Sequence, residues 1–231
     1  MFDLSPAEST AILLSLRVAV IATLVATPFG IALAFVLARS NFWGKSVLDA
    51  AVHLPLVLPP VVTGYLLLLA LGRRGPIGAW LADHLGIVFA FRWTGAALAC
   101  GVMSFPLLVR PIRLSIEAVD RRLEQAASTL GAAPWRVFAT VTLPLALPGI
   151  LAGMVLGFAK AIGEFGATIT FVSNIPGETQ VISSAIYSLI QTPDGDAAAM
   201  RLVVVSVLIA MAALVGSEWF ARRATRRLHG N

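Results

Sequence analysis

Five long apolar runs dominate the chain, and the short segments between them carry most of its Lys and Arg residues. About 20 apolar residues, folded as a helix, cross the hydrocarbon core of a bilayer. Charged residues make up 13% of the chain, roughly half of the fraction that is usual in soluble domains. The sequence therefore predicts an all-α, polytopic membrane protein in which residues 1–231 form a single membrane domain. We expect about five transmembrane helices, near residues 10–38, 47–71, 93–109, 148–166 and 199–220.

The distribution of positive charge predicts which loops face the cytoplasm, because cytoplasmic loops carry an excess of Lys and Arg. The side with the excess has Arg39, Lys45, Arg110, Arg113, Arg121, Arg122, Arg136 and the tail residues Arg222, Arg223, Arg226 and Arg227. The opposite side has only Arg73, Arg74, Arg92 and Arg201. We therefore expect a periplasmic N-terminus, a cytoplasmic C-terminus and a cytoplasmic segment at residues 110–147. The first apolar run is expected to remain as a span, since no basic residue precedes Arg17 as a cleavable signal peptide would require.

Several classes of function are disfavoured. The net charge of +5 comes from residues at the ends of apolar runs and not from a basic face with interleaved aromatics, so we expect no nucleic-acid partner. His53, His84 and His229 share no ligand spacing, and Cys100 is the only cysteine. We therefore expect no metal site and no catalytic residue. The glycine-rich stretch "GRRGPIG" lacks the lysine of a phosphate-binding loop, so any ATPase would be a separate chain and this chain would bind no cofactor.

Residues 110–147 are too charged at their start to cross the bilayer. Arg113, Glu117 and Arg121 are spaced for pairing on one helix face. Gly131 suits a helix end or a sharp turn, and Pro134 suits the first turn of the next helix. Two short helices joined by a turn are therefore expected at the cytoplasmic surface. They would be either an ordinary amphipathic loop or a docking element for a partner protein.

Prolines punctuate the apolar runs as well. Pro144 and Pro148 are expected to bend or break the chain where it re-enters the membrane. Prolines at positions 55, 59 and 60 predict a break in the second run, which is tolerated where neighbours satisfy the backbone or where it lines a cavity. A stripe of small residues in the fourth run predicts close helix packing, either within the subunit or across a dimer. Its members are Gly149, Gly153 and Gly157.

Five polar or charged residues within the runs are candidates for a translocation pathway. Lys160 and Glu164 are four residues apart, and would form either a structural ion pair or part of the pathway lining. Arg17 would either extend its charge to the outer surface or attract an anion at the mouth. Thr63 and Ser104 are pathway candidates, although a hydrogen bond back to their own helix is the commoner arrangement.

Within residues 110–147 the chain resembles the integral subunits of bacterial ABC importers. That family carries Glu-Ala-Ala, three residues, Gly, nine residues and Ile-x-Leu-Pro, and the chain departs from it at Gln125 and Val141, with Glu124 next to the altered position. The resemblance implies a coupling helix that fits a cleft on the ATP-hydrolysing subunit. The residues it assigns to coupling are Glu124, Gln125, Ala126, Ala127, Gly131, Pro134, Leu143 and Pro144.

The resemblance extends over most of the chain. "HLPLVLPPVVTGYLLL", "VMSFPLLVRPIRL" and "GEFGATITFVSNIPGETQ" are similar to segments of bacterial molybdate importer permeases, in the same order. This similarity implies the type I ABC importer permease fold in the bacterial inner membrane, surrounded by membrane lipid. It also implies a homodimer, a cytoplasmic ATPase dimer that holds ATP and Mg²⁺, and a periplasmic molybdate-binding protein. Sulfate, thiosulfate or tungstate remain alternative substrates, and a membrane enzyme or a passive channel are alternative classes.

Overall fold

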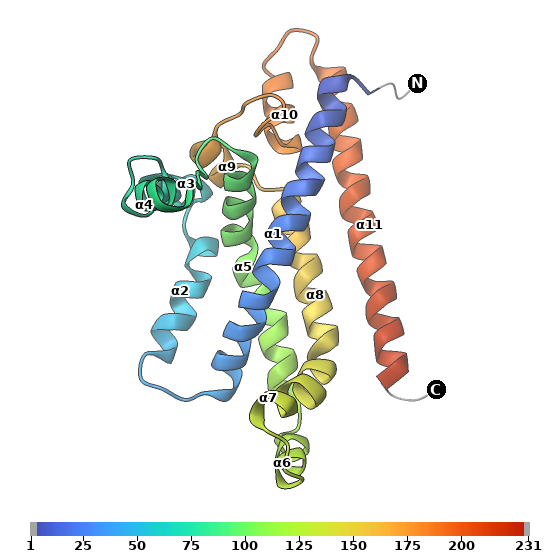
Figure 1. Cartoon of the computed structure of the whole chain (residues 1–231). Coiled ribbons are helices and arrows are strands. Elements are labelled where there is room, and N and C mark those ends of the chain that lie inside the picture. Colours follow the sequence, from blue (N-terminus) through green and yellow to red (C-terminus); the bar gives the residue numbers. More distant parts are fainter. Residues whose placement is uncertain (1–3, 229–231) are drawn as a thin grey trace.

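The computed structural model describes the backbone of residues 4–228 and the side chains of residues 4–216, and this part of the chain is helical throughout its regular structure (Figure 1). Four long helices lie roughly along one axis: α1 (Pro6–Arg39), α5 (Trp93–Ala118), α8 (Leu143–Ile162) and α11 (Asp196–Leu228). Among the described residues, four helical stretches are long and apolar enough to cross a membrane, or five if a bent pair counts as one span. The all-α polytopic architecture expected from the sequence is confirmed.

Helix α1 begins at a capping box. Ser5 accepts a hydrogen bond from the Glu8 backbone N–H, and the Glu8 carboxylate accepts one from the Ser5 N–H, at 3.2 and 2.6 Å. Ser-Pro-Ala-Glu at this position is the sequence signature of such a start, with proline in the first helical turn. Glu8 also pairs with Arg201 near the start of α11 at 2.9 Å, which joins these two helices at one end of the bundle.

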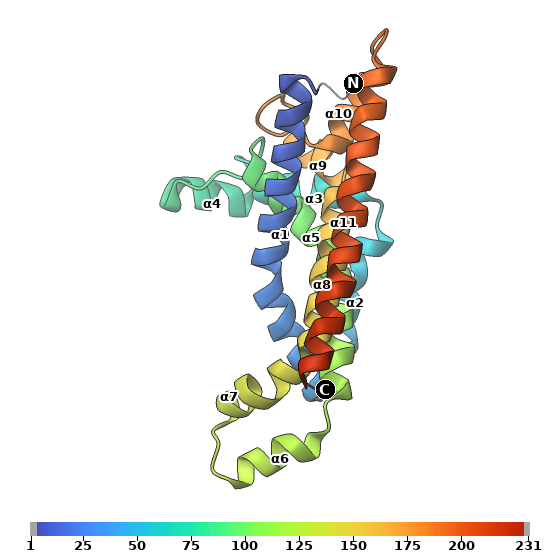
Figure 2. The same cartoon turned by 90° about the vertical axis from the view of Figure 1, so that its right-hand side faces the viewer.

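The second predicted span is broken. Helix α2 (Lys45–Val57) and helix α3 (Pro60–Leu71) meet at an angle of 113°. Pro59 and Pro60 lack backbone N–H groups, and a residue before proline is driven out of the helical region, so a helix cannot continue through this point. Helix α3 therefore leaves the bundle axis and is followed by α4 (Pro76–Leu85), which projects sideways in Figure 2.

The start of residues 110–147 differs from the sequence-based expectation. Helix α5 extends beyond the predicted span, residues 93–109, to Ala118, and it contains Pro106 and Pro111. Glu117 pairs with Arg113 at 2.8 Å, but Arg121 begins a different helix, α6 (Arg121–Thr129), so the predicted alignment of Glu117 with Arg121 on one helix face is wrong.

Pro144 does not break the chain either. Helix α7 (Pro134–Val137) runs through a π-helical turn, η1 (Phe138–Thr142), directly into α8, and Pro148 lies inside α8. The Leu143 N–H donates to the Phe138 carbonyl five residues back. This wider turn places the chain so that Pro144, which has no N–H, occupies the first turn of the following α-helix.

The interior of the bundle lies where α5 packs between α1 and α8. A side-chain carbon added at Gly153 would meet the Leu108 carbonyl oxygen of α5, and one at Gly149 would meet Ser115 and the Pro111 carbonyl. Gly157 leaves ordinary contact distance to Leu108. The glycine stripe therefore packs within the subunit, against α5, which is one of the two arrangements left open by the sequence.

The two ends of the bundle differ. Helices α9 (Gly166–Val172) and α10 (Ile182–Leu189) lie toward the end where α1 begins, and α6 and α7 lie at the end where α11 finishes (Figure 1). Arg39 and Arg136 both lie at the α6 end, and the charge pattern predicted that they share one side. The tail residues Arg222, Arg223, Arg226 and Arg227 lie outside the residues whose side chains are described.

Candidate functional site

The first candidate region is the helical hairpin formed by α6 and α7, which projects beyond the end of the bundle (Figure 2). The Asp120 carboxylate caps α6 by accepting a hydrogen bond from the Arg122 N–H at 2.9 Å. The turn after α6 contains Gly131 at φ +85°, a left-handed conformation that glycine adopts without strain. Pro134 then begins α7. The two short helices and the turn predicted from sequence are present.

Apolar side chains on this hairpin face outward. Leu130 is 89% exposed, Trp135 is 67% exposed and Leu123 is 50% exposed. Helix α6 has no buried residue. Of the positions that the ABC-importer motif singles out, Gln125, Ala126 and Gly131 are exposed, and a side chain added at Gly131 would enter open space. Such a projecting surface with small residues at its centre is suited to docking against another protein.

Glu124 differs from its neighbours on α6, because its carboxylate turns toward the bundle. Its side chain is 18% exposed, and one oxygen accepts hydrogen bonds from the Arg39 guanidinium at 2.9 Å and from the Thr142 hydroxyl at 2.7 Å. Arg39 also donates to the Val119 carbonyl at 3.1 Å. We call these three residues, Arg39, Glu124 and Thr142, the Glu124 network.

The Glu124 network joins three elements: the last turn of α1, helix α6 and the π-helical turn that leads into α8. Arg39 and Thr142 were not singled out from the sequence as functional residues. Their only sequence signal is weak, namely an arginine at the end of an apolar run and a threonine between the motif positions Val141 and Leu143. Hydrogen bonds that involve a charged group are stronger than those between neutral groups. The Glu124 network therefore fixes the hairpin to α1 and to the turn that leads into α8.

The second candidate region is the break between α8 and α9. Lys160 Nζ lies 2.7 Å from Glu164 Oε2, and the other Glu164 oxygen accepts a hydrogen bond from the Ala167 N–H at 3.0 Å. Glu164 is 1% exposed, whereas the Lys160 side chain is 29% exposed. The pair is thus an ion pair that also fixes the start of α9, and the Lys160 side chain is the more exposed of the two.

Thr63 lies close to this break. It precedes Gly64, where an added side chain would meet the Ala167 backbone, so α3 and α9 pack directly against each other beside Glu164. Thr63 is 6% exposed, and its hydroxyl has no hydrogen-bond partner among the described residues. An unsatisfied buried hydroxyl is uncommon. Thr63, Lys160 and Glu164 therefore belong to one region of the fold.

The two remaining pathway candidates lie elsewhere. Ser104 is buried and donates to the Gly101 carbonyl of its own helix at 3.2 Å, which is the commoner alternative considered from sequence. Arg17 is exposed on α1, and its guanidinium carbon lies 3.8 Å from the centroid of the Trp93 ring. Among the described residues there is no group of three His, Cys, Asp or Glu that could hold a metal ion.

Comparison with known proteins agrees with this architecture. Residues 26–229 match the family model described as binding-protein-dependent transport system inner membrane component. The chain is 61% identical to the molybdenum transport system permease protein ModB of Escherichia coli (strain K12), over 97% of this chain and 98% of that protein. It is 56% identical to ModB of Haemophilus influenzae, over 96% of each. The solved structure of the MetNI methionine ABC transporter, in an inward-facing conformation, matches at a TM-score of 0.69 and 15% identity, covering 94% of this chain and 95% of that chain.

Proposed function

Because the chain belongs to the binding-protein-dependent inner membrane transport components, and among them to the molybdenum transport permeases, we propose that it forms the path by which molybdate crosses the bacterial inner membrane. It is a multi-pass permease subunit of a molybdate ABC transporter, and the ATPase is a separate chain. The chain itself carries out no covalent chemistry. The membrane-enzyme and passive-channel alternatives do not fit this family.

The observation that carries the mechanism is the Glu124 network. The exposed hairpin supplies the docking surface for the ATPase, with Gln125, Ala126, Ala127 and Gly131 at its centre and Pro134 at the start of its second helix. When the two ATPase subunits close on ATP and Mg²⁺, they move this hairpin. The bonds from Glu124 to Arg39 and Thr142 pass that movement to α1 and α8, and Leu143 and Pro144 begin the helix that moves.

The family and the charge pattern support the following arrangement of partners, which is part of the proposal. Two copies of the subunit lie over the ATPase dimer and receive the anion from a periplasmic molybdate-binding protein. The N-terminus faces the periplasm and the hairpin faces the cytoplasm, because the excess of Lys and Arg is on the hairpin side.

For the pathway itself, we propose the region around Lys160, Glu164 and Thr63. Within the bilayer, polar and ionisable residues are expensive and mostly face a cavity or each other. The partly exposed Lys160 side chain attracts the dianion, while Glu164 limits how tightly it is held. A carrier needs such a balance, since an anion bound too strongly would not leave.

The experiment that tests the substrate is ATP hydrolysis by the complex of this chain and its ATPase in proteoliposomes. Its periplasmic binding protein is added either with molybdate or with sulfate. We expect stimulation by the molybdate-loaded protein alone. Stimulation by the sulfate form would keep the ABC mechanism and transfer the substrate to the sulfate class. No stimulation by either form, in an assembled complex, would contradict the proposal.

A further inference from the structure

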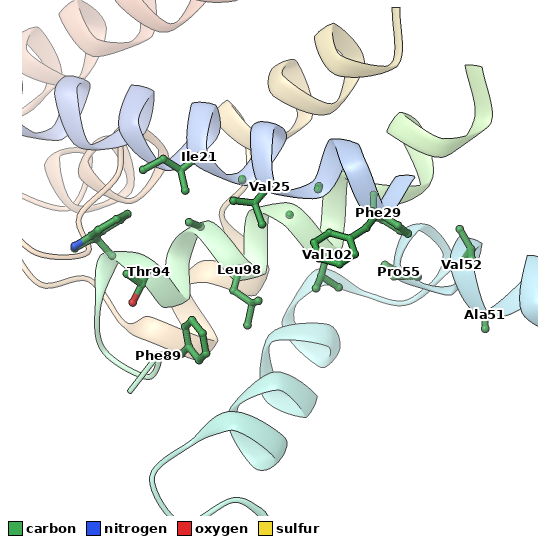
Figure 3. A pocket seen from close by; sticks show the side chains of 16 residues that line it. Ile21, Val25, Phe29, Ala51, Val52, Pro55, Phe89, Thr94, Leu98 and Val102 are labelled. Atoms are coloured by element: carbon green, nitrogen blue, oxygen red, sulfur yellow. The ribbon is translucent and has the colours of Figure 1, made fainter. Parts of the chain in front are cut away.

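A long apolar groove lies on the side of the bundle, between α1, α5 and α2 (Figure 3). Its volume is about 710 Å³, within the range of pockets that hold small ligands. The groove is partly open, and its lining includes the buried core residues Ala22, Ala26 and Ala97. Its long walls are formed by Ile21, Val25, Phe29, Leu98, Val102 and Phe105.

The groove is elongated, so its shape suits an extended chain. Ile21, Val25 and Phe29 lie on successive turns of one face of α1, so this wall alone is about 12 Å long at the rise of an α-helix. The lining is almost entirely carbon. An occupant that fills it must therefore be apolar over most of its length and must lie parallel to the transmembrane helices.

One end of the groove carries positive charge. Trp93 lines the groove, and Arg17 lies over its ring, 3.8 Å from the centroid. Arg17 is one helical turn before Ile21, and it is exposed. Among the described residues no carboxylate lies within ion-pair distance of Arg17, whereas Arg39 and Arg201 each have one and Arg113 has two. The neighbouring Arg92 is exposed as well.

We propose that this groove binds one anionic phospholipid, with an acyl chain against α1 and α5 and the phosphate against Arg17. A guanidinium that stacks on an indole still presents its N–H edge, and this edge matches two phosphate oxygens. A cation in a membrane span is costly without a counter-charge. The lipid supplies both that counter-charge and the apolar filling of the groove. Within its own subunit Arg17 has no carboxylate among the described residues, and a lipid phosphate would supply this charge together with the apolar filling.

The site is distinct from the hairpin and from the Lys160–Glu164 region, and the inference requires only that the chain spans a membrane. Its failure would therefore leave the transport function untouched. Arg17 was a candidate for the anion pathway, and in this proposal it binds the phosphate of a membrane lipid instead. The bound lipid is expected to hold α1 and α5 at a fixed spacing beside the bent α2–α3 pair.

The test uses the complete transporter, exchanged into nanodiscs of phosphatidylcholine alone or phosphatidylcholine with 20% phosphatidylglycerol, and then released for native mass spectrometry. We expect one tightly retained phosphatidylglycerol per subunit. Arg17→Gln should weaken its retention about tenfold, as the loss of a charged hydrogen bond would. Arg74→Gln is the matched control, since it removes an exposed arginine between α3 and α4. It should retain the lipid as the unmodified chain does.

A second variant tests the apolar wall. Val25→Trp fills the groove and should displace the lipid, whereas Leu24→Trp, at an exposed α1 position outside the groove, should not. The same spectra report the subunit stoichiometry. Equal retention in all four variants, equal retention of phosphatidylcholine and phosphatidylglycerol, or loss of the dimer in Val25→Trp without loss of lipid would each overturn the proposal. The last result would assign the groove to a second copy of the chain.

Discussion

Two carboxylates in this protein, Glu124 and Glu164, each accept two hydrogen bonds and each join separate helical elements, but they do so in different surroundings. Glu124 lies at the end of the bundle where the α6–α7 hairpin projects, and its side chain is 18% exposed. Glu164 lies at a break between transmembrane elements and is 1% exposed. Removing a partner from the first leaves a group that water can solvate, whereas removing one from the second leaves a charge in an apolar environment. The first contact is therefore suited to transmitting movement, and the second to holding the fold.

The largest expected effect is on assembly, from Glu164→Gln. This change leaves the Lys160 ammonium without its partner and weakens the cap on α9 at Ala167. Breaking a buried pair costs about 3–5 kcal/mol, and we expect the lower end because Lys160 is partly exposed. The yield of monodisperse protein and its melting temperature in detergent should both fall.

The double variant Lys160→Met with Glu164→Gln removes both charges, and it should recover part of this loss. Equal defects in the single and double variants would show that the two residues do not act as a pair. The comparison of the two carboxylates would then lose its basis.

The next effect is on transport, from Gly131→Asp. At φ +85° an Asp residue is strained by about 1–2 kcal/mol, but its Cβ atom would enter open space, with no neighbouring atom within 4 Å. The subunit should therefore insert and remain folded, while molybdate uptake should be abolished, because a charge would occupy the docking turn.

Gly44→Asp is a closely matched control for Gly131→Asp. Gly44 has φ +94°, also faces open space and lies at the start of α2 on the same side of the bundle. It should leave most uptake intact. Normal uptake by the Gly131→Asp variant would contradict the assignment of the hairpin to ATPase docking.

A smaller effect is expected from Thr142→Val. Thr142 is buried, and its hydroxyl donates to Glu124 at 2.7 Å. Losing this charged hydrogen bond should cost about 1.5–3 kcal/mol and should lower the transport rate while ATP hydrolysis continues. Thr140→Val is the control, because the Thr140 hydroxyl donates to the Arg136 carbonyl one turn earlier and not to Glu124. If both variants transported alike, Thr142 would have no part in coupling.

The smallest effect is expected from Glu117→Gln. Arg113 would keep Asp49 at 2.9 Å after losing Glu117 at 2.8 Å. Exposed ion pairs contribute about 0–1 kcal/mol, so the melting temperature should hardly change and transport should be normal. A loss as large as that of Glu164→Gln would mean that exposure does not separate the two kinds of ion pair in this protein.

The two carboxylates also show what the sequence can predict. Lys160 and Glu164 are four residues apart in an apolar run, a local spacing from which the ion pair was foreseen as one alternative. Glu124 reaches Arg39 across 85 positions and Thr142 across 18. No local pattern encodes such contacts, since they depend on how α1, α6 and α8 pack.

The prolines also show that local sequence alone does not predict the final geometry. Three prolines in the second apolar run predicted a break, and the break is there, but the 113° turn depends on the packing of α3 against α9. Pro144 was expected to bend or break the chain, but the π-helical turn before it leads directly into α8, so that the chain stays helical through Pro144. Tertiary context decides whether a proline ends a helix or is absorbed into one.

The central claim is that Glu124 carries the movement of the ATPase into the spans, and its most direct test is the number of molybdate ions imported per ATP hydrolysed. The complex would be reconstituted in proteoliposomes with the molybdate-loaded binding protein, and Glu124→Ala compared with Glu117→Ala, which removes a more exposed carboxylate that pairs with Arg113 outside the docking surface. We predict that the Glu124→Ala complex assembles and hydrolyses ATP but imports several-fold less molybdate per ATP, while Glu117→Ala keeps the unmodified ratio. An unchanged ratio in an assembled Glu124→Ala complex would contradict the account.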